Sequence, residues 1–300
     1  MKSKLNNYFI ATRPWSFPAS TMPALITLTY IFYINEEISG NINWWYGIIA
    51  IIGAAIFQAS SNLINDYFDY KYQVDRPESF GSSRLLVEKV FTPKFILSYG
   101  FVLLGIGVLL GLFLWYKTGN ALLWIGIIGT LAAVLYSKLK YVALGDLIIF
   151  IIYGPLIGLG TAYVMTQQLM WKIILINIPI AFLVVNILHA NNTRDIRDDN
   201  KAHIKTQSMV LGLKRAKIQY VTLAVGAYVM IALLIILRMI HPIVLLVFLT
   251  VPLTIKNIRQ MQTAQVEKPE LIKDLDAKSA QLVLLFGLIF SICNMIGNWL

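Results

Sequence analysis

The chain alternates long apolar stretches with short polar segments over nearly all of its 300 residues. A helix that crosses a bilayer needs about 20 predominantly apolar residues. Nine stretches come close to or exceed that length, so we expect nine transmembrane helices and little room for a soluble domain. They lie at about 15–34, 44–66, 95–116, 120–137, 143–165, 171–192, 216–237, 240–256 and 279–299.

The composition agrees with this pattern. Hydrophobic residues make up 58% of the chain and charged residues only 13%, which is unusual for a soluble domain. We therefore predict an all-α membrane protein with a single polytopic domain over residues 1–300. No convincing cleavage site follows the first apolar run near Trp15, so we expect it to stay as the first helix. The only cysteine, Cys293, cannot form an intrachain disulfide.

The net charge of +10 follows the membrane topology. Of the 25 Lys and Arg residues, 22 lie in the N-terminal tail and in alternate loops, and only Lys117, Lys172 and Arg238 lie between them. The positive-inside rule then places the N-terminus and the polar loops at about 62–94 and 191–215 in the cytoplasm, with the C-terminus outside. The expected partners are membrane lipids, and nucleic acid is not expected.

Two polar clusters stand out because each follows an apolar stretch and both have the same spacing. The first is Asn62, Asp66 and Asp69, and the second is Asn191, Asp195 and Asp198, followed directly by Asp199. On a continuous α-helix, offsets of 0, 4 and 7 residues fall within about 60° of one another. We therefore expect each set of three to share one helix face. Two identical spacings also favour a functional role.

Clustered carboxylate and amide oxygens are ligands suited to Mg²⁺ or Mn²⁺. Basic residues follow or surround both clusters and could hold phosphate oxygens. A simpler alternative is that both clusters are solvated helix ends, with basic residues present for topology or anionic lipid. Another alternative is an ion-coupled transporter, but that would place carboxylates near the bilayer midplane, whereas these gather at one membrane face.

These residues resemble the UbiA superfamily of intramembrane aromatic prenyltransferases over nearly the whole chain. The first motif of that family is similar to Asn65-Asp66-Tyr-Phe-Asp69, and the second to Asp195-x-x-x-Asp199. The segment Tyr136-Ser-Lys-Leu-Lys140 is similar to a Tyr-x-x-x-Lys element of the family. Many members have an Asp where this chain has Gln73, with Asp75 two residues later. That displaced Asp looks like the branch that prenylates 1,4-dihydroxy-2-naphthoate in menaquinone synthesis.

The resemblance implies a UbiA-type fold, with nine helices around a central cavity that opens to lipid. It implies Mg²⁺-dependent transfer of a polyprenyl group from polyprenyl diphosphate to an aromatic acceptor, with 1,4-dihydroxy-2-naphthoate as the expected acceptor. Other acceptors of the superfamily stay open, namely 4-hydroxybenzoate, haem, a chlorin or a glycerol phosphate lipid. The location implied is a bacterial plasma membrane.

The resemblance also implies roles for individual residues. The expected catalytic residues are Asp66, Asp69, Asp195 and Asp199. The expected Mg²⁺ ligands are these four together with Asn62 and Asn191. Substrate contacts are expected from Arg13, Asn62, Asn65, Lys71, Arg84, Tyr136, Lys140, Asn191, Arg194 and Lys201. Asp75 and Asp69 are candidates for the base that removes the ring proton, whereas His189 and Asp146 are expected to have structural roles.

Overall fold

A computed structural model describes residues 4–76, 80, 83–202 and 204–300. Within these ranges the regular secondary structure is helical, apart from one isolated backbone bridge between Val142 and Lys205. The all-α prediction is therefore confirmed. In chain order the elements are α1 (Lys4–Ala11), η1 (Pro14–Ser16), α2 (Pro18–Tyr33), η2 (Asn35–Glu37), α3 (Trp44–Lys71), α4 (Pro93–Thr118), α5 (Ala121–Lys140), α6 (Gly145–Ile151), η3 (Ile152–Leu156), α7 (Ile157–Thr166), α8 (Lys172–Arg194), α9 (Ile196–Lys201), α10 (Gln207–Leu211), α11 (Leu213–Ile236), η4 (Pro242–Thr250), α12 (Val251–Gln262), η5 (Pro269–Ile272) and α13 (Leu275–Gly297).

Seven helical segments in the described part of the chain are long and apolar enough to cross a membrane. They are α3, α4, α6 through α7, α8, α11, η4 through α12, and η5 through α13. The expected number of nine is not confirmed. The first predicted stretch begins with the short η1 turn at Pro14–Ser16, which leaves α2 only 16 residues. The apolar part of α5 ends at Tyr136, ahead of Lys138 and Lys140.

Close packing fixes α8, the helix that leads into the second cluster. The segment from α6 to α7 passes through the π-helical turn η3, which contains Pro155. A Cβ atom added to Gly154 would lie 2.4 Å from Cβ of Ala181, and one added to Gly158 would lie 2.4 Å from Nδ2 of Asn177. Small residues spaced four apart allow such a close approach between membrane helices. The backbone of α7 therefore lies directly against α8.

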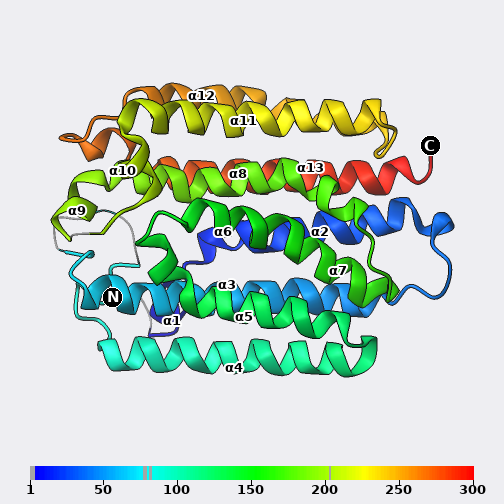
Figure 1. Ribbon diagram of the computed structural model, residues 1–300, viewed down its shortest axis with the longest axis horizontal. Helices are drawn as coiled ribbons and strands as arrows, with labels where there is room; N and C mark the ends of the chain where they lie inside the picture. Colours follow the sequence, from blue (N-terminus) through cyan, green and yellow to red (C-terminus); the bar gives the residue numbers. More distant parts are fainter. Residues whose placement is uncertain (1–3, 77–79, 81–82, 203) are drawn as a thin grey trace.

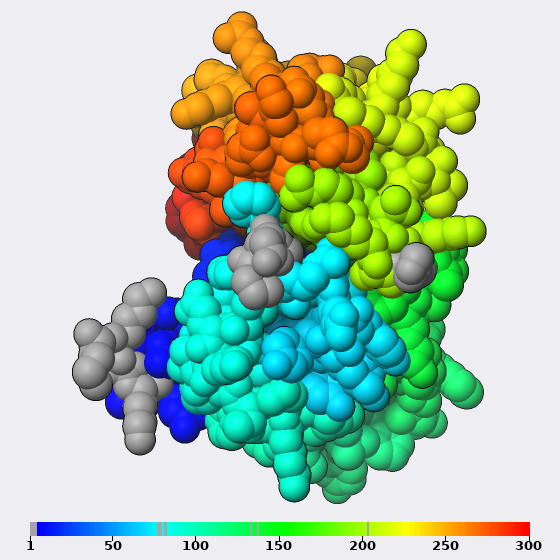
Figure 2. All heavy atoms as spheres, turned by 90° about the vertical axis from the view of Figure 1, so that its left-hand side faces the viewer, coloured from blue at the N-terminus to red at the C-terminus, as the bar shows by residue number. Residues whose placement is uncertain are grey.

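The long helices run side by side, and both Asp clusters lie at one end of the bundle, with α9 and α10 (Figure 1). The C-terminus lies at the opposite end (Figure 1). Figure 2 looks onto the cluster end, where the segment after α3 (cyan), the α9–α10 region (yellow-green) and the segment before α13 (orange) come together. Parts of the chain more than 100 residues apart thus surround the same region.

Candidate active site

Asp69, in the last turn of α3, is held by two hydrogen-bond donors and one nearby cation. The hydroxyl of Tyr141 donates to Oδ1 at 2.6 Å, and Nδ2 of Asn65 donates to Oδ2 at 2.6 Å. The ammonium of Lys140 lies 3.7 Å from Oδ2. Asp69 is 4% exposed, and a buried carboxylate requires such partners. Asn65, expected to contact substrate, thus also orients Asp69. Burial, and then the nearby Asp69 carboxylate, raise the pKa of Tyr141, so this hydroxyl stays protonated as a donor.

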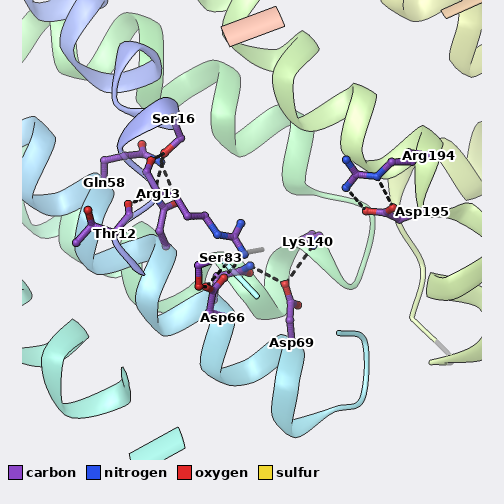
Figure 3. A network of polar contacts seen from close by, with 12 residues as sticks. Thr12, Arg13, Ser16, Gln58, Asp66, Asp69, Ser83, Lys140, Arg194 and Asp195 are labelled. Carbon is purple, nitrogen blue, oxygen red and sulfur yellow. Dashed lines mark hydrogen bonds and ion pairs between the residues drawn. The ribbon is translucent and has the colours of Figure 1, made fainter. Parts of the chain in front are cut away.

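Asp66 forms an ion pair with Arg13, which comes from the turn between α1 and η1 (Figure 3). Its other oxygen accepts a 2.7 Å hydrogen bond from the hydroxyl of Ser83. Burial alone would lower the pKa of Arg13, but the nearby carboxylates of Asp66 and Asp75 raise it overall, so Arg13 stays cationic. The N-terminal segment therefore supplies a cation to the first cluster.

The side-chain amides of Asn62 and Gln58 form a chain of hydrogen bonds that extends along α3 from the first cluster toward the membrane interior. Nδ2 of Asn62 donates to the backbone oxygen of Thr12 and to Oγ of Ser16, both at 2.8 Å. Oδ1 of Asn62 accepts from Nε2 of Gln58 at 3.2 Å. Both polar atoms of Asn62 thus have protein partners, and its role as a Mg²⁺ ligand stays a prediction. The sequence analysis did not single out Gln58, because a lone Gln in an apolar helix carries no motif.

The second cluster does not lie on one continuous helix, so the predicted shared face of Asn191, Asp195 and Asp198 is wrong. Helix α8 ends at Arg194, Asp195 takes a non-helical conformation, and α9 begins at Ile196. Asp198, in α9, lies close to three cations. Nη2 of Arg76 lies 3.4 Å from its carboxylate, Arg197 lies at 3.7 Å and Lys201 at 3.8 Å.

Arg194 binds the Asp195 carboxylate through two parallel contacts, Nε to Oδ1 at 2.7 Å and Nη2 to Oδ2 at 2.8 Å. Its Nη1 lies 3.3 Å from Oδ2 of Asp276, near the start of α13. Burial raises the pKa of Asp195, and Arg194 partly opposes that rise. Arg194, expected to contact substrate, therefore links the second cluster to α13. Asp276 has no motif around it, so sequence reasoning missed it.

Side chains from both clusters line one polar cavity of about 160 Å³. Ten of the predicted site residues are among its walls: Arg13, Asn62, Asn65, Asp69, Tyr136, Lys140, Asn191, Arg194, Asp195 and Asp199. Asp75, Asp198 and Asp276 also line it. The structure thus brings the two clusters together although they are far apart in sequence.

Four predicted site residues lie elsewhere in the part of the chain that the structure describes. Asp66 lies behind Arg13, which itself lines the cavity. Lys71 lies about 6 Å from the rings of Tyr67 and Tyr72. The other two are Arg84, which is 3.4 Å from Glu88, and Lys201, which is paired with Asp198. None of the three basic residues is among the described residues that line the polar cavity, and their contact with substrate stays a prediction.

A larger apolar cavity of about 460 Å³ adjoins the polar one. Its walls come from α2, α3, α4, α5 and the segment from α6 to α7. Five residues line both cavities, namely Gln58, Ser61, Tyr136, Ile149 and Tyr153. The two spaces therefore share a boundary, with charged groups on one side and hydrocarbon on the other.

The donor set of the second cluster fits a divalent cation. Oδ1 of Asn191 and Oδ2 of Asp199 are buried and have no hydrogen-bond partner among the described residues. Such oxygens favour a bound cation or its water. Burial raises the pKa of Asp199 to about 7, partly opposed by Lys140. Among the described residues, no three Asp, Glu, His or Cys side chains could hold a metal by themselves. A metal here would need further oxygens from amides, water or substrate.

A buried network below the second cluster fixes α8 to its neighbours. Nδ1 of His189 lies 2.7 Å from Oδ2 of Asp146 on α6, and Nε2 lies 2.9 Å from the backbone oxygen of Ala216 on α11. Nδ2 of Asn192 donates to the other oxygen of Asp146 at 3.2 Å. These contacts agree with the structural roles expected for His189 and Asp146.

Residues 24–271 match the UbiA prenyltransferase family. The chain belongs to this family. It is 30% identical over 291 residues to the 1,4-dihydroxy-2-naphthoate octaprenyltransferase of Bacillus subtilis, covering 95% of this chain and 91% of that protein. It is 29% identical over 296 residues to UbiA prenyltransferase domain-containing protein 1 of Danio rerio, covering 97% of this chain and 84% of that protein.

The fold also matches that of a UbiA homolog from Archaeoglobus fulgidus, whose structure was solved bound to GPP and Mg²⁺. The TM-score is 0.64 at 17% identity, and the match covers 95% of this chain and 99% of that chain. Together with the seven apolar helices, membership of the UbiA family identifies the chain as a multi-pass integral membrane protein and as an enzyme of the prenyltransferase class.

Proposed function

We propose that this UbiA-family protein transfers a polyprenyl group from polyprenyl diphosphate to an aromatic acceptor in a Mg²⁺-dependent reaction. The boundary between the two cavities is the observation that carries this proposal. A polyprenyl diphosphate has an apolar tail and a charged head joined at one carbon, C1. With the tail in the apolar cavity and the head in the polar one, C1 lies beside the five shared residues.

The reaction breaks the bond between C1 and the diphosphate oxygen, and the electron pair leaves with the diphosphate. Lys140, held between the two clusters, and Arg13 are positioned to stabilise that negative charge. When bound by Asp69, Asp195, Asp199 and Asn191, Mg²⁺ would add charge neutralisation at the same oxygens. Tyr136 and Tyr153 line both cavities, and their aromatic rings would stabilise the allylic cation that develops at this boundary.

The acceptor ring then forms a carbon–carbon bond to C1, and the attacked ring carbon loses its proton to a base. Asp69 and Asp75 both line the polar cavity and are the candidates for that base. Water would trap the cation, and the apolar walls of the larger cavity exclude it from the tail side.

For the acceptor we propose 1,4-dihydroxy-2-naphthoate, and hence a role in menaquinone synthesis in a bacterial plasma membrane. The name and similarity of the Bacillus subtilis relative support this choice. The Danio rerio relative is almost as similar, so the acceptor must be tested directly.

The test uses purified protein in lipid nanodiscs with Mg²⁺ and a labelled polyprenyl diphosphate. The acceptors are 1,4-dihydroxy-2-naphthoate, 4-hydroxybenzoate, a haem, a chlorin and a glycerol phosphate. We expect a prenylated product from 1,4-dihydroxy-2-naphthoate. EDTA should abolish its formation, and excess Mg²⁺ should restore it. Product with another acceptor alone would overturn the acceptor, and neither product nor diphosphate release with any acceptor would overturn the proposed activity.

A further inference from the structure

Tyr141 contacts Asp69 of the first cluster and also Lys205, which follows the second cluster in the chain. It follows directly after the end of α5 at Lys140. Its hydroxyl donates to Oδ1 of Asp69 in the first cluster at 2.6 Å. Its backbone oxygen accepts from the backbone N–H of Lys205, which follows the second cluster, at 3.0 Å. The next residue, Val142, forms the isolated bridge with Lys205.

The contact with Lys205 continues to Asp199. The backbone N–H of Ile204, the residue before Lys205, donates to the backbone oxygen of Asp199 at 3.2 Å. A route of hydrogen bonds and short backbone segments therefore runs from the Asp69 carboxylate through Tyr141 to Asp199. The rest of the described contacts around Tyr141 include an edge-to-face packing of its ring on Tyr72, with ring centres 6.0 Å apart.

The hydroxyl of Tyr141 completes the orientation of Asp69. Asn65 and Lys140 both approach Oδ2 of Asp69, whereas the contact with Oδ1 comes from Tyr141. Donors on both oxygens fix the plane of a carboxylate, which matters when the remaining lone pairs must meet a cation. Tyr141 is not among the described residues that line the polar cavity, so its effect passes through Asp69.

We propose that Tyr141 is a positioning residue that holds Asp69 at a fixed orientation and distance from Asp199, so that both clusters can bind metal for one diphosphate. This inference rests on the proposed function. A diphosphate is small, so two metal-binding carboxylates that share it must keep their separation within a fraction of an ångström. Tyr141 supplies that constraint through the short hydrogen bond from its hydroxyl to Asp69 and through the backbone hydrogen bonds that connect it to Asp199 by way of Lys205 and Ile204.

Tyr141→Phe tests the proposal, because it removes the hydroxyl and keeps the ring that packs on Tyr72. The matched control is Tyr163→Phe, which removes a hydroxyl that donates to the backbone oxygen of Thr118 at 2.8 Å, far from both clusters. Mn²⁺ binding without substrate is measured by electron paramagnetic resonance, and the Mg²⁺ concentration for half-maximal turnover is measured separately. Removing the orienting partner of a metal ligand weakens metal binding by about 10- to 100-fold.

For Tyr141→Phe we expect metal binding to weaken to this extent in both measurements, and saturating Mg²⁺ should recover most of the turnover. For Tyr163→Phe we expect no change in either measurement. Wild-type Mn²⁺ affinity in Tyr141→Phe would overturn the proposal, and so would equal weakening in both variants, since that indicates a general loss of structure. If the wild-type protein prenylates no acceptor, the proposed function fails, but the Mn²⁺ titration still decides the role of Tyr141.

Discussion

Asp199 combines a buried carboxylate with an oxygen that has no partner among the described residues. Burial raises its pKa to about 7, so near neutral pH the group is divided between its neutral and ionised forms. A metal requires the ionised form, and protons therefore compete with Mg²⁺ at this position. The same burial that excludes water from the site makes its metal affinity sensitive to pH.

We expect Mn²⁺ affinity to rise with pH up to about 7 and then to level off. Below that pKa, Asp199 is mostly protonated, and affinity should fall by up to about tenfold for each pH unit, the limit for one competing proton. Titrations between pH 5.5 and 8.5 would measure this. Asp198→Asn is the control and should keep the same profile. A flat wild-type profile through this range would show that Asp199 does not ligate the metal.

Asp69 and Asp198 are both buried aspartates, but we predict opposite importance for catalysis. Both line the polar cavity, but Asp69 is oriented by hydrogen bonds from Tyr141 and Asn65, whereas the carboxylate of Asp198 is paired with three cations. Asp69→Asn should lower kcat/KM by about 100-fold or more, the loss typical of a group that stabilises transition-state charge. Asp198→Asn should lower it much less, because the charge of Asp198 is already paired with cations of the protein. Steady-state kinetics with purified variants would compare them, and a larger loss in Asp198→Asn would contradict this assignment.

At the scale of the elements, a break in one helix decides which carboxylates meet. Helix α8 ends at Arg194, and Asp199 lies in the next helix, α9. The backbone N–H of Asp199 donates to the backbone oxygen of Asp195 at 2.8 Å. On an unbroken helix Asp198 would have followed Asn191 and Asp195 along one face. At the break, the side chains of Arg194 and Asp195 form their two parallel contacts.

The sequence predicts most helices because apolar length is a local signal. The apolar stretch at 171–192 predicts α8, which spans Lys172–Arg194. The polar cluster at the end of this stretch is likewise visible in the sequence. The partners within the site were not predictable in this way. Arg13 meets Asp66 across 53 residues, and Tyr141 meets Asp69 across 72. Such pairs depend on how helices pack, and they leave no periodic pattern in one sequence.

The contact between η3 and α8 makes a testable prediction for Gly154. An added Cβ there would lie 2.4 Å from Cβ of Ala181, so Gly154→Ala must push the two helices apart. Overpacking of this kind costs about 1–3 kcal/mol. The matched control is Gly105→Ala on α4, where an added Cβ meets nothing within 4 Å. Thermal unfolding in detergent should show a lower Tm for Gly154→Ala than for Gly105→Ala. Equal Tm values would show that the interface adapts without cost.

At the scale of the whole molecule, the distribution of basic residues predicts one orientation in the membrane. The end that carries both Asp clusters also carries the basic loops, and the positive-inside rule places such loops in the cytoplasm. A water-soluble diphosphate would then be released where it can be hydrolysed and recycled. The opposite end carries η2 and the C-terminus, with few basic residues.

Cysteine labelling can test this orientation, because the only native cysteine, Cys293, is buried. Lys268→Cys lies in the exposed segment between α12 and η5, and Glu36→Cys lies on exposed η2 near the other end. In intact bacterial cells, a membrane-impermeant maleimide should label Glu36→Cys and leave Lys268→Cys unlabelled until the cells are opened. The native chain should show no labelling in either condition. Labelling of Lys268→Cys in intact cells would place the diphosphate end of the enzyme outside and would require a different source of substrate.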